Sequence, residues 1–285
     1  MKNNFFQIYS TENGGYFDDY NPKYIHSYIT YVHSEFKESE LDQYDHWVFD
    51  KCNETQENIL DSSLLLNVEN FTNSAFIKYY YNSEEKNYYS LEDEKFKWPH
   101  LEHGTARRDN VYLTTVIQKC TNYSVINKLF GNCPPKEEID QYVSKYFAIY
   151  FYFSDNQINP LDYKNPIQRY LNIITSGIGT NFSYAENYIY FSPLKIKTRE
   201  GEIISKTKEN NTFYFDTNRR GTAVNSGEFF KLSKYYYLMQ NNVQIYERRY
   251  NNLFDILAQI GGEIQFLYYL FFPFKNKNKR RRNNI

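Results

Sequence analysis

The sequence predicts a mainly β (α+β) protein: a β-sandwich-like domain at residues 1–250, a few short helices, and a C-terminal apolar helix that enters a membrane. Three observations predict this fold class. Aromatic residues make up 20% of the 285 residues, which favours strands and excludes a disordered chain. Runs of apolar and β-branched residues of strand length recur along the sequence. Near the C-terminus, an apolar stretch of helical length precedes a run of Lys and Arg.

The first half of the chain predicts three strands and one helix. Alternating apolar residues predict a strand at 24–32, and β-branched residues predict another at 111–119. Residues 147–153 have no polar alternation, so we expect a core strand that is covered on both faces. Residues 82–103 are charged and irregular, which indicates an exposed loop. Two prolines followed by acidic residues predict a short helix at 134–143.

The second half predicts strands separated by turns. Strands are expected at 188–191, 194–198, 203–204, 213–215 and 235–246, with turns at 199–202 and 218–221. No internal repeat is visible, and no linker clearly separates two domains within residues 1–250.

Charge is balanced overall but not along the chain. With 33 Lys+Arg against 34 Asp+Glu, the net charge is -1, which argues against a general nucleic-acid binder. Residues 275–285 nevertheless contain no acid and carry a basic block, which consists of Lys275, Lys277, Lys279, Arg280, Arg281 and Arg282. A basic block directly after an apolar stretch is the signal that places a chain end in the cytoplasm.

Residues 251–274 form the candidate transmembrane helix. Leu253 to Phe274 is twenty-two residues, about the length that crosses a 30 Å hydrocarbon core. Asp255 and Glu263 oppose insertion, because a carboxylate at the centre of a membrane helix costs about 2.5–3.5 kcal/mol. Gly261 and Gly262 offer a small-residue surface on which a partner helix packs and shelters Glu263. The alternative is an amphipathic helix that packs on the β domain and ends in a solvated basic tail.

Residues on both sides of this helix are candidates for the membrane interface. Tyr246, Arg248, Arg249 and Tyr250 are expected at the outer headgroups. The cytoplasmic anchors would be Lys275, Arg280, Arg281 and Arg282, within the basic tail 275–285. For Arg248 and Arg249, the alternative is an ordinary surface position on the last strand.

The cysteines and glycosylation sequons depend on the compartment. Cys52, Cys120 and Cys133 form no CxxC pair and no zinc-ligand spacing, so we expect no metal on thiolates. Cys120 and Cys133 close a short disulfide loop if the compartment is oxidising, and otherwise all three thiols stay reduced. An extracytoplasmic domain would make candidate glycosylation sites of five asparagines, which are Asn53, Asn70, Asn122, Asn181 and Asn210.

No motif in the sequence names a reaction. GxSxG, HExxH, P-loop and EF-hand patterns do not occur, so we expect no catalytic residue and no enzyme activity. His100 to His103 indicates a solvated loop rather than a metal site, and Gly177 to Gly179 indicates a strand turn rather than a dinucleotide loop. We therefore expect no cofactor and no resident metal.

The order of several short motifs resembles a known family. Tyr246-Glu-Arg248-Arg-Tyr250, followed by an apolar helix with Gly261-Gly262, is similar to the Tyr-x-Arg-x-Tyr…Gly-Gly junction in a large ciliate-expanded family of uncharacterised transmembrane proteins. Further similar segments lie between about residues 110 and 272, at Ile117–Cys120, Cys133–Asp140, Ile158–Pro166, Ile189–Pro193 and Thr198–Gly201. The resemblance implies a β-rich extracytoplasmic domain between two membrane helices, with no established activity. This sequence shows no apolar helix ahead of the domain, so we expect a single-pass protein as it stands, or a two-pass protein if the N-terminus is truncated.

Three functional hypotheses follow from these features. The leading one is a non-enzymatic membrane-anchored protein with an extracytoplasmic binding or scaffolding domain. The second, suggested by Glu263 with Gly261-Gly262, is a subunit of a channel or transport assembly. The third, suggested by the missing N-terminal signal, is a cytosolic tail-anchored protein. The expected partners are membrane lipid and a protein partner or second copy that contacts the C-terminal helix, but no nucleic acid.

Overall fold

A computed structural model describes most of the chain. The described residues are 4–10, 17–18, 20–32, 38–52, 68, 73–100, 112–121, 125–159, 161–162, 165–178, 183–200, 206–224, 231–249, 251 and 253–282. They divide into two compact units, residues 1–193 with 213–243 and residues 194–212 with 244–285. Each unit is described by itself.

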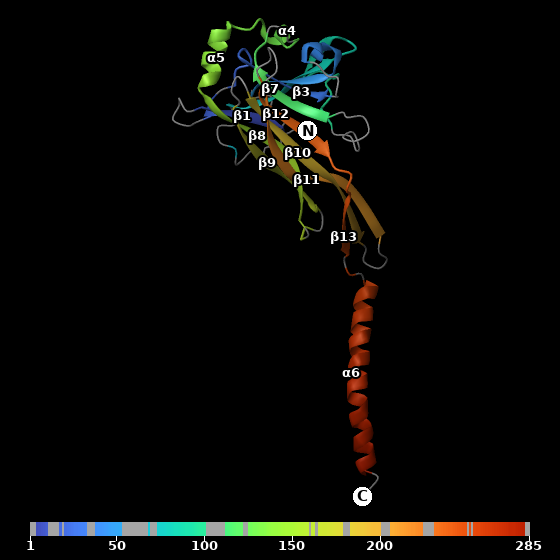
Figure 1. The fold of residues 1–285 in the computed structure, drawn as a ribbon. Helices are drawn as coiled ribbons and strands as arrows, with labels where there is room; N and C mark the ends of the chain where they lie inside the picture. The colour runs from blue at the N-terminus through green and yellow to red at the C-terminus, as the bar shows by residue number, and fades with distance from the viewer. Residues whose placement is uncertain are drawn as a thin grey trace. The chain divides into compact units, whose positions relative to one another are not determined.

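The described residues form a mainly β structure (Figure 1). The strands are β1 (Phe5–Ser10), β2 (Phe17–Asp18), β3 (Ile25–Val32), β4 (His46–Lys51), β5 (Ala75–Asn82), β6 (Asn87–Ser90), β7 (Tyr112–Lys119), β8 (Tyr146–Ile158), β9 (Ile167–Gly177), β10 (Ser183–Glu200), β11 (Lys206–Val224), β12 (Lys231–Met239) and β13 (Gln244–Arg249). The helices are η1 (Glu38–Gln43), α4 (Asn127–Phe130), α5 (Lys136–Ser144) and α6 (Leu253–Arg282).

A single hydrogen-bonded sheet runs in the order β11-β10-β12-β7-β3-β4-β5-β1-β8-β9. Off this path, β13 pairs with β10, β2 with β1 and β6 with β5. Most neighbours are antiparallel, but β12 and β13 both run parallel to β10. The sequence predicted a sandwich-like domain, whereas the described strands belong to one sheet.

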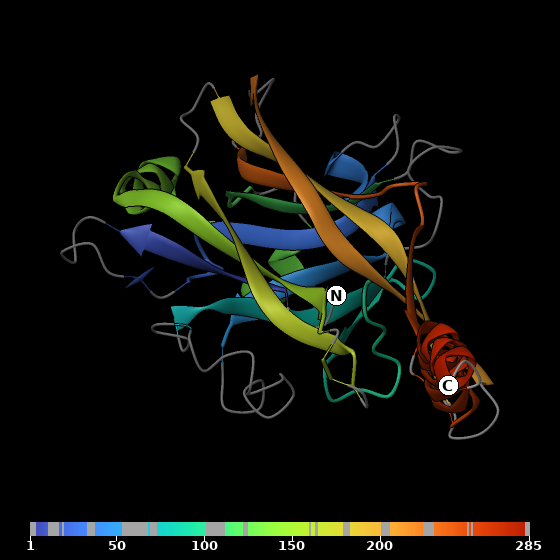
Figure 2. The same cartoon turned by 90° about the horizontal axis from the view of Figure 1, so that it is seen from below.

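This sheet is curled, so that its two ends face each other (Figure 2). The rings of Phe151 on β8 and Tyr235 on β12 stack with centroids 4.4 Å apart, although five strands separate β8 from β12 along the sheet. The Asn187 side-chain amide on β10 donates to Ser176 Oγ on β9 at 2.8 Å. The Phe215 N–H on β11 donates to Asp155 Oδ1 on β8 at 2.6 Å. The core therefore lies inside the curl.

Side-chain alternation explains how these strands build that core. Along β12, Tyr235, Tyr237 and Met239 are buried, while Tyr236 and Leu238 between them are half-buried on the other face. On β8, by contrast, side chains on both faces are buried in the stretch around Phe151. The prediction of a core strand covered on both faces is thus confirmed for residues 148–153, in which only Tyr150 is half-buried.

Several predicted element boundaries are wrong. The turn expected at 218–221 lies inside the continuous strand β11, and residues 87–90 of the predicted loop form β6. The segments 188–191 and 194–198 belong to one strand, β10, which contains Pro193. β12 pairs with β10 up to Phe191, and pairing with β13 begins at Leu194, so Pro193 lies where β10 changes its partner on this edge. The strand expected at 235–246 is likewise divided into β12 and β13.

The second unit contains the ends of β10 and β11, together with β13 and α6. Lys195 on β10 and Glu209 on β11 form an ion pair at 2.7 Å. The helix expected at 253–274 is present, but it continues to Arg282, so the predicted tail begins as helix rather than as a separate segment. Among the described helices, none combines the length and the apolar character needed to cross a membrane.

Candidate functional site

The outer face of strands β7, β10 and β12 holds a pocket of about 640 Å³. Because successive side chains alternate between the faces of a strand, Tyr188 and Tyr190 on β10 and Tyr236 and Leu238 on β12 point away from the core. The lining consists of Tyr112, Tyr188, Tyr190, Tyr236, Leu238, Met239, Gln240, Asn241 and Asn242, which we call the tyrosine pocket. All nine lining residues belong to the first unit, and none carries a formal charge.

Two tyrosine rings in this pocket are held in a fixed stack. Tyr188 and Tyr236 are register partners on the parallel strands β10 and β12, and their ring centroids lie 4.8 Å apart at an interplanar angle of 5°. The two carboxylate oxygens of Glu186 accept hydrogen bonds from Tyr188 at 2.8 Å and from Tyr236 at 3.2 Å. Tyr184 also donates to Glu186, at 3.0 Å. One carboxylate therefore fixes three phenols, two of which line the pocket.

These tyrosines remain protonated at neutral pH. Burial and then the hydrogen bond to Glu186 raise the pKa of Tyr188 to about 12. Burial, followed by the negative charge of Glu186, also raises the pKa of Tyr236. Lys234 Nζ lies 4.5 Å from the centroid of the Tyr236 ring, a cation–π distance. The lining thus offers neutral rings and amides, a set that suits binding rather than proton transfer or nucleophilic attack.

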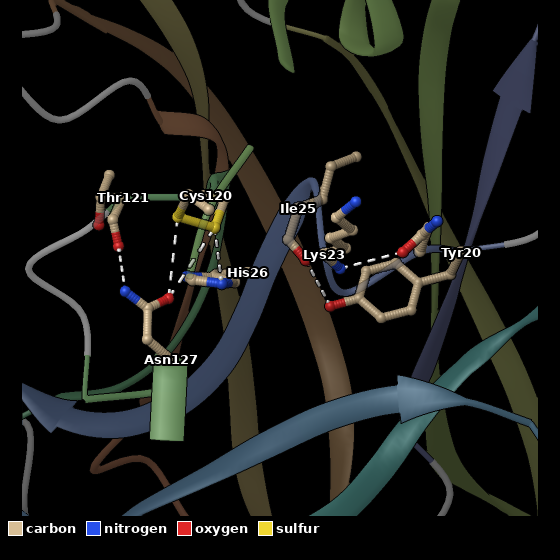
Figure 3. Close-up of a disulfide and its surroundings, with 9 residues drawn as sticks. Tyr20, Lys23, Ile25, His26, Cys120, Thr121 and Asn127 are labelled. Carbon is tan, nitrogen blue, oxygen red and sulfur yellow. Dashed lines mark hydrogen bonds between the residues drawn. A yellow bond between two sulfur atoms is a disulfide. The ribbon is translucent and has the colours of Figure 1, made fainter. Parts of the chain in front are cut away.

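A second cluster surrounds the disulfide between Cys120 and Cys133 (Figure 3). Cys120 follows β7, and its N–H donates to Tyr24 O at 2.8 Å. His26 on β3 is fully buried, with Nε2 3.1 Å from Cys120 Sγ. Asn127 Oδ1 lies 3.9 Å from Cys120 Sγ and 3.7 Å from Cys133 Sγ. Of the two states expected for these cysteines, the structure contains the disulfide, and it adds His26 and Asn127, which sequence spacing did not indicate.

The residues predicted to pack a membrane helix lie on α6. Glu263 is exposed, and a methyl group added at Gly261 or Gly262 would meet no atom of the described chain within 4 Å. Apolar side chains along the helix are exposed as well, including Leu257, which is 53% exposed. The described chain therefore leaves this surface of α6 open.

The residues predicted to lie at the outer headgroups differ in exposure. Arg248 is buried on β13, only 8% exposed, and its guanidinium donates to Thr198 Oγ1 on β10 at 3.2 Å. β-strand alternation thus turns Arg248 inward, and its expected role at the lipid headgroups stays a prediction. Arg249 is exposed and pairs with Asp255 on α6 at 2.6 Å, while Tyr246 is half-buried. Tyr250 lies outside the described residues.

The remaining predicted sites are mostly outside the described side chains. Asn210 is half-buried on β11. The other four sequons, at Asn53, Asn70, Asn122 and Asn181, lie outside the described residues. The predicted cytoplasmic anchors lie in the last turns of helix α6, at Lys275, Arg280, Arg281 and Arg282.

Comparison with known proteins gives one match. Residues 5–246 match the model of the family described as "Uncharacterised 80 kDa protein N-terminal domain". The chain belongs to this family. No curated protein and no solved structure matches the chain. The matched range contains both the tyrosine pocket and the disulfide cluster, whereas α6 follows it.

The sequence carried a signal for the tyrosine pocket that the motif analysis missed. Tyr188 and Tyr190 alternate with core residues, and so do Tyr236 and Leu238. Aromatic side chains gathered on the face away from the core are the pattern that indicates a candidate binding surface. The disulfide cluster left no comparable signal, because His26 is separated from Cys120 by 94 positions.

Proposed function

We propose that this chain is a non-enzymatic binding protein whose β domain takes an uncharged carbohydrate in its tyrosine pocket. The proposal rests on the lining itself, in which neutral aromatic rings stand beside three amide side chains. A sugar ring has apolar C–H faces that pack on aromatic rings and a rim of hydroxyl groups that bonds to amides. Gln240, Asn241 and Asn242 supply those amide donors and acceptors at one end of the pocket.

Preorganisation supports the same proposal. Glu186 and the Tyr188–Tyr236 stack fix the rings before any ligand arrives, so binding does not have to order them. The absence of charge among the nine lining residues favours a neutral ligand over a phosphate or a carboxylate. Phenols with raised pKa values also make poor bases and nucleophiles, which favours binding without chemistry.

The test is calorimetric titration of the full chain with cellotetraose, chitotetraose and mannotetraose, with adenosine as a neutral aromatic ligand. At least one oligosaccharide should bind, and Tyr190→Ala and Asn242→Ala should each weaken it about tenfold, equivalent to about 1.4 kcal/mol. Tyr170→Ala is the matched control, since Tyr170 is 38% exposed on β9 and does not line the pocket. Binding of adenosine alone would show that the carbohydrate assignment is wrong. If the pocket variants bind the oligosaccharide as tightly as the control does, the tyrosine pocket is not the binding site.

We further propose that α6 attaches this domain to a membrane and leaves the domain extracytoplasmic, in keeping with the resemblance to transmembrane proteins. The support is a row of exposed apolar side chains at helical spacing, including Leu257, Ile260 and Ile264. The basic block that follows favours a cytoplasmic end. The ion pair between Arg249 and Asp255 reduces the charge that the start of the helix would bring to a bilayer.

Vesicle flotation tests this attachment. The full chain should float with phosphatidylcholine vesicles that contain phosphatidylserine, and the triple variant Leu257→Gln, Ile260→Gln, Ile264→Gln should not. Val224→Gln with Ile245→Gln is the control, because both side chains are exposed and apolar but lie on strands. Flotation of the triple variant equal to that of the control would contradict a role for α6. Labelling of Cys52 by a membrane-impermeant maleimide in sealed microsomes would then report the side on which the domain lies.

A further inference from the structure

The disulfide cluster brings four potential metal-binding atoms together. The two Sγ atoms of Cys120 and Cys133 and His26 Nε2 all lie within 4.8 Å of one another. Asn127 Oδ1 is the fourth atom, at 3.9 Å and 3.7 Å from the two sulfurs. The residues come from β3, from the end of β7 and from the α4 region, so the fold and not the local sequence assembles them.

Each of these groups is held in position by its own backbone or side-chain contacts. His26 pairs with Gln118 in the ladder between β3 and β7, which fixes its backbone in the middle of the sheet. The Asn127 side-chain amide donates to Thr121 O at 3.1 Å, and this bond turns Oδ1 towards the sulfurs (Figure 3). Such outer contacts orient metal ligands in known zinc sites.

A structural disulfide does not require a buried imidazole beside it. His26 is fully buried, and its Nδ1 has no hydrogen-bond partner among the described residues. Burying an imidazole in this way is unfavourable, because polar groups that leave water normally gain a partner. The neutral imidazole has a lone pair to offer, and Nε2 is the nitrogen that lies at the sulfur.

We propose that reduction of the Cys120–Cys133 disulfide converts this cluster into a Zn²⁺ site, with Cys120, Cys133 and His26 as ligands. Two thiolates and an imidazole are a donor set that favours zinc over magnesium or calcium. Asn127 Oδ1, or a water bound to it, occupies the fourth position. The disulfide and the zinc site are two exclusive states of the same residues.

The chemistry balances with a reductant of the dithiol class. Two electrons and two protons from the dithiol convert the disulfide into two thiols, and the dithiol becomes a disulfide. Zinc then binds two sulfurs and one nitrogen, and the two thiol protons pass to solvent. In a tetrahedral site with Zn–S distances of about 2.3 Å, the two sulfurs stand about 3.8 Å apart. Cys133 is half-buried between α4 and α5, whereas Cys120 is buried, so this movement is assigned to Cys133.

The experiment uses the full chain reduced with a phosphine and titrated with Co²⁺ and then Zn²⁺. One Co²⁺ per chain should produce the thiolate charge-transfer and tetrahedral d–d absorption bands, and Zn²⁺ should remove them. The oxidised chain should bind neither ion at this site. With zinc present, alkylation should modify Cys52 but spare Cys120 and Cys133.

Variants distinguish the cluster from adventitious binding. Cys133→Ser should weaken zinc binding at least about 100-fold, because even changes in residues behind the ligands cost 10–100-fold. His26→Gln should weaken binding and shift the Co²⁺ spectrum, and Cys52→Ser is the matched control that should change nothing. If the reduced chain binds zinc no more tightly than Cys133→Ser or the oxidised chain does, the proposal is overturned. A reduced chain that unfolds and does not refold when zinc is added would overturn it as well.

Discussion

Replacement of Phe151 tests the closure of the sheet on itself. Phe151 on β8 is fully buried, and its ring stacks on Tyr235 of β12 at 4.4 Å. Phe151→Ala removes a whole buried ring, so the free energy of unfolding should fall by about 3–5 kcal/mol. The ring pair itself should account for about 0.5–1.5 kcal/mol of this loss. Phe151→Leu, which keeps most of the volume, should cost less than about 2 kcal/mol.

Urea denaturation of the oxidised chain measures these losses, with Ile173→Ala as the control because Ile173 is 50% exposed on the neighbouring strand β9. The control should lose less than about 1 kcal/mol. A double-mutant cycle with Phe151→Leu and Tyr235→Leu should give a coupling energy of about 0.5–1.5 kcal/mol. No coupling, together with a loss for Phe151→Ala as small as that of the control, would show that β8 and β12 do not face each other.

Three further predictions concern stability. Cys133→Ser should lower the free energy of unfolding by about 3 kcal/mol, because it removes the disulfide that closes a loop of about 15 residues. If the lost disulfide is the cause, the urea midpoint of the variant should equal that of the reduced wild type. Burial lowers the pKa of His26 and of His46 to about 4 from 6.5. The free energy of unfolding should therefore be highest above pH 6.5 and fall by up to about 3 kcal/mol per histidine as the pH drops towards 4. In urea titrations at several pH values, His46→Gln should show a smaller fall. A fall equal to that of the wild type would contradict this prediction. Asp155→Ala leaves the Phe215 N–H without its acceptor and should cost about 1–3 kcal/mol by the same assay, whereas a loss below 0.5 kcal/mol would argue against the link between β8 and β11.

The strand at 147–153 was predictable from the sequence because burial on both faces leaves a local mark. An unbroken apolar run is what a doubly covered strand requires, and it needs no knowledge of the neighbouring strands. The same holds for the helix around Ile139 and Val143, whose apolar spacing and preceding prolines are local as well. The number of sheets was not predictable in this way, since the pairing of β1 with β8 depends on residues more than a hundred positions apart.

Arg248 and Arg249 show why the sequence could not indicate which face of β13 each arginine takes. Arginine next to tyrosine before an apolar helix is typical of headgroup anchoring, and the pattern indicates no more than that. Which face of β13 the side chain takes depends on the register with β10, where Thr198 is its direct partner. A shift of one residue would exchange Arg248 and Arg249 between the buried and the exposed face. The exposed arginine, Arg249, is the one left to pair with Asp255.

The tyrosine pocket arises from the same division of one strand into two that the sequence concealed. β12 ends at Met239, and β13 begins only at Gln244. At this end, Gln240 N–H donates to Phe191 O on β10 at 2.7 Å. The residues between them leave the ladder, so the side chains of Asn241 and Asn242 are not part of the strand alternation. They meet the outer-face tyrosines at the place where the ladder stops. In a continuous strand at 235–246 these residues would have stayed in the ladder and followed its alternation, so the proposed binding function depends on the interruption.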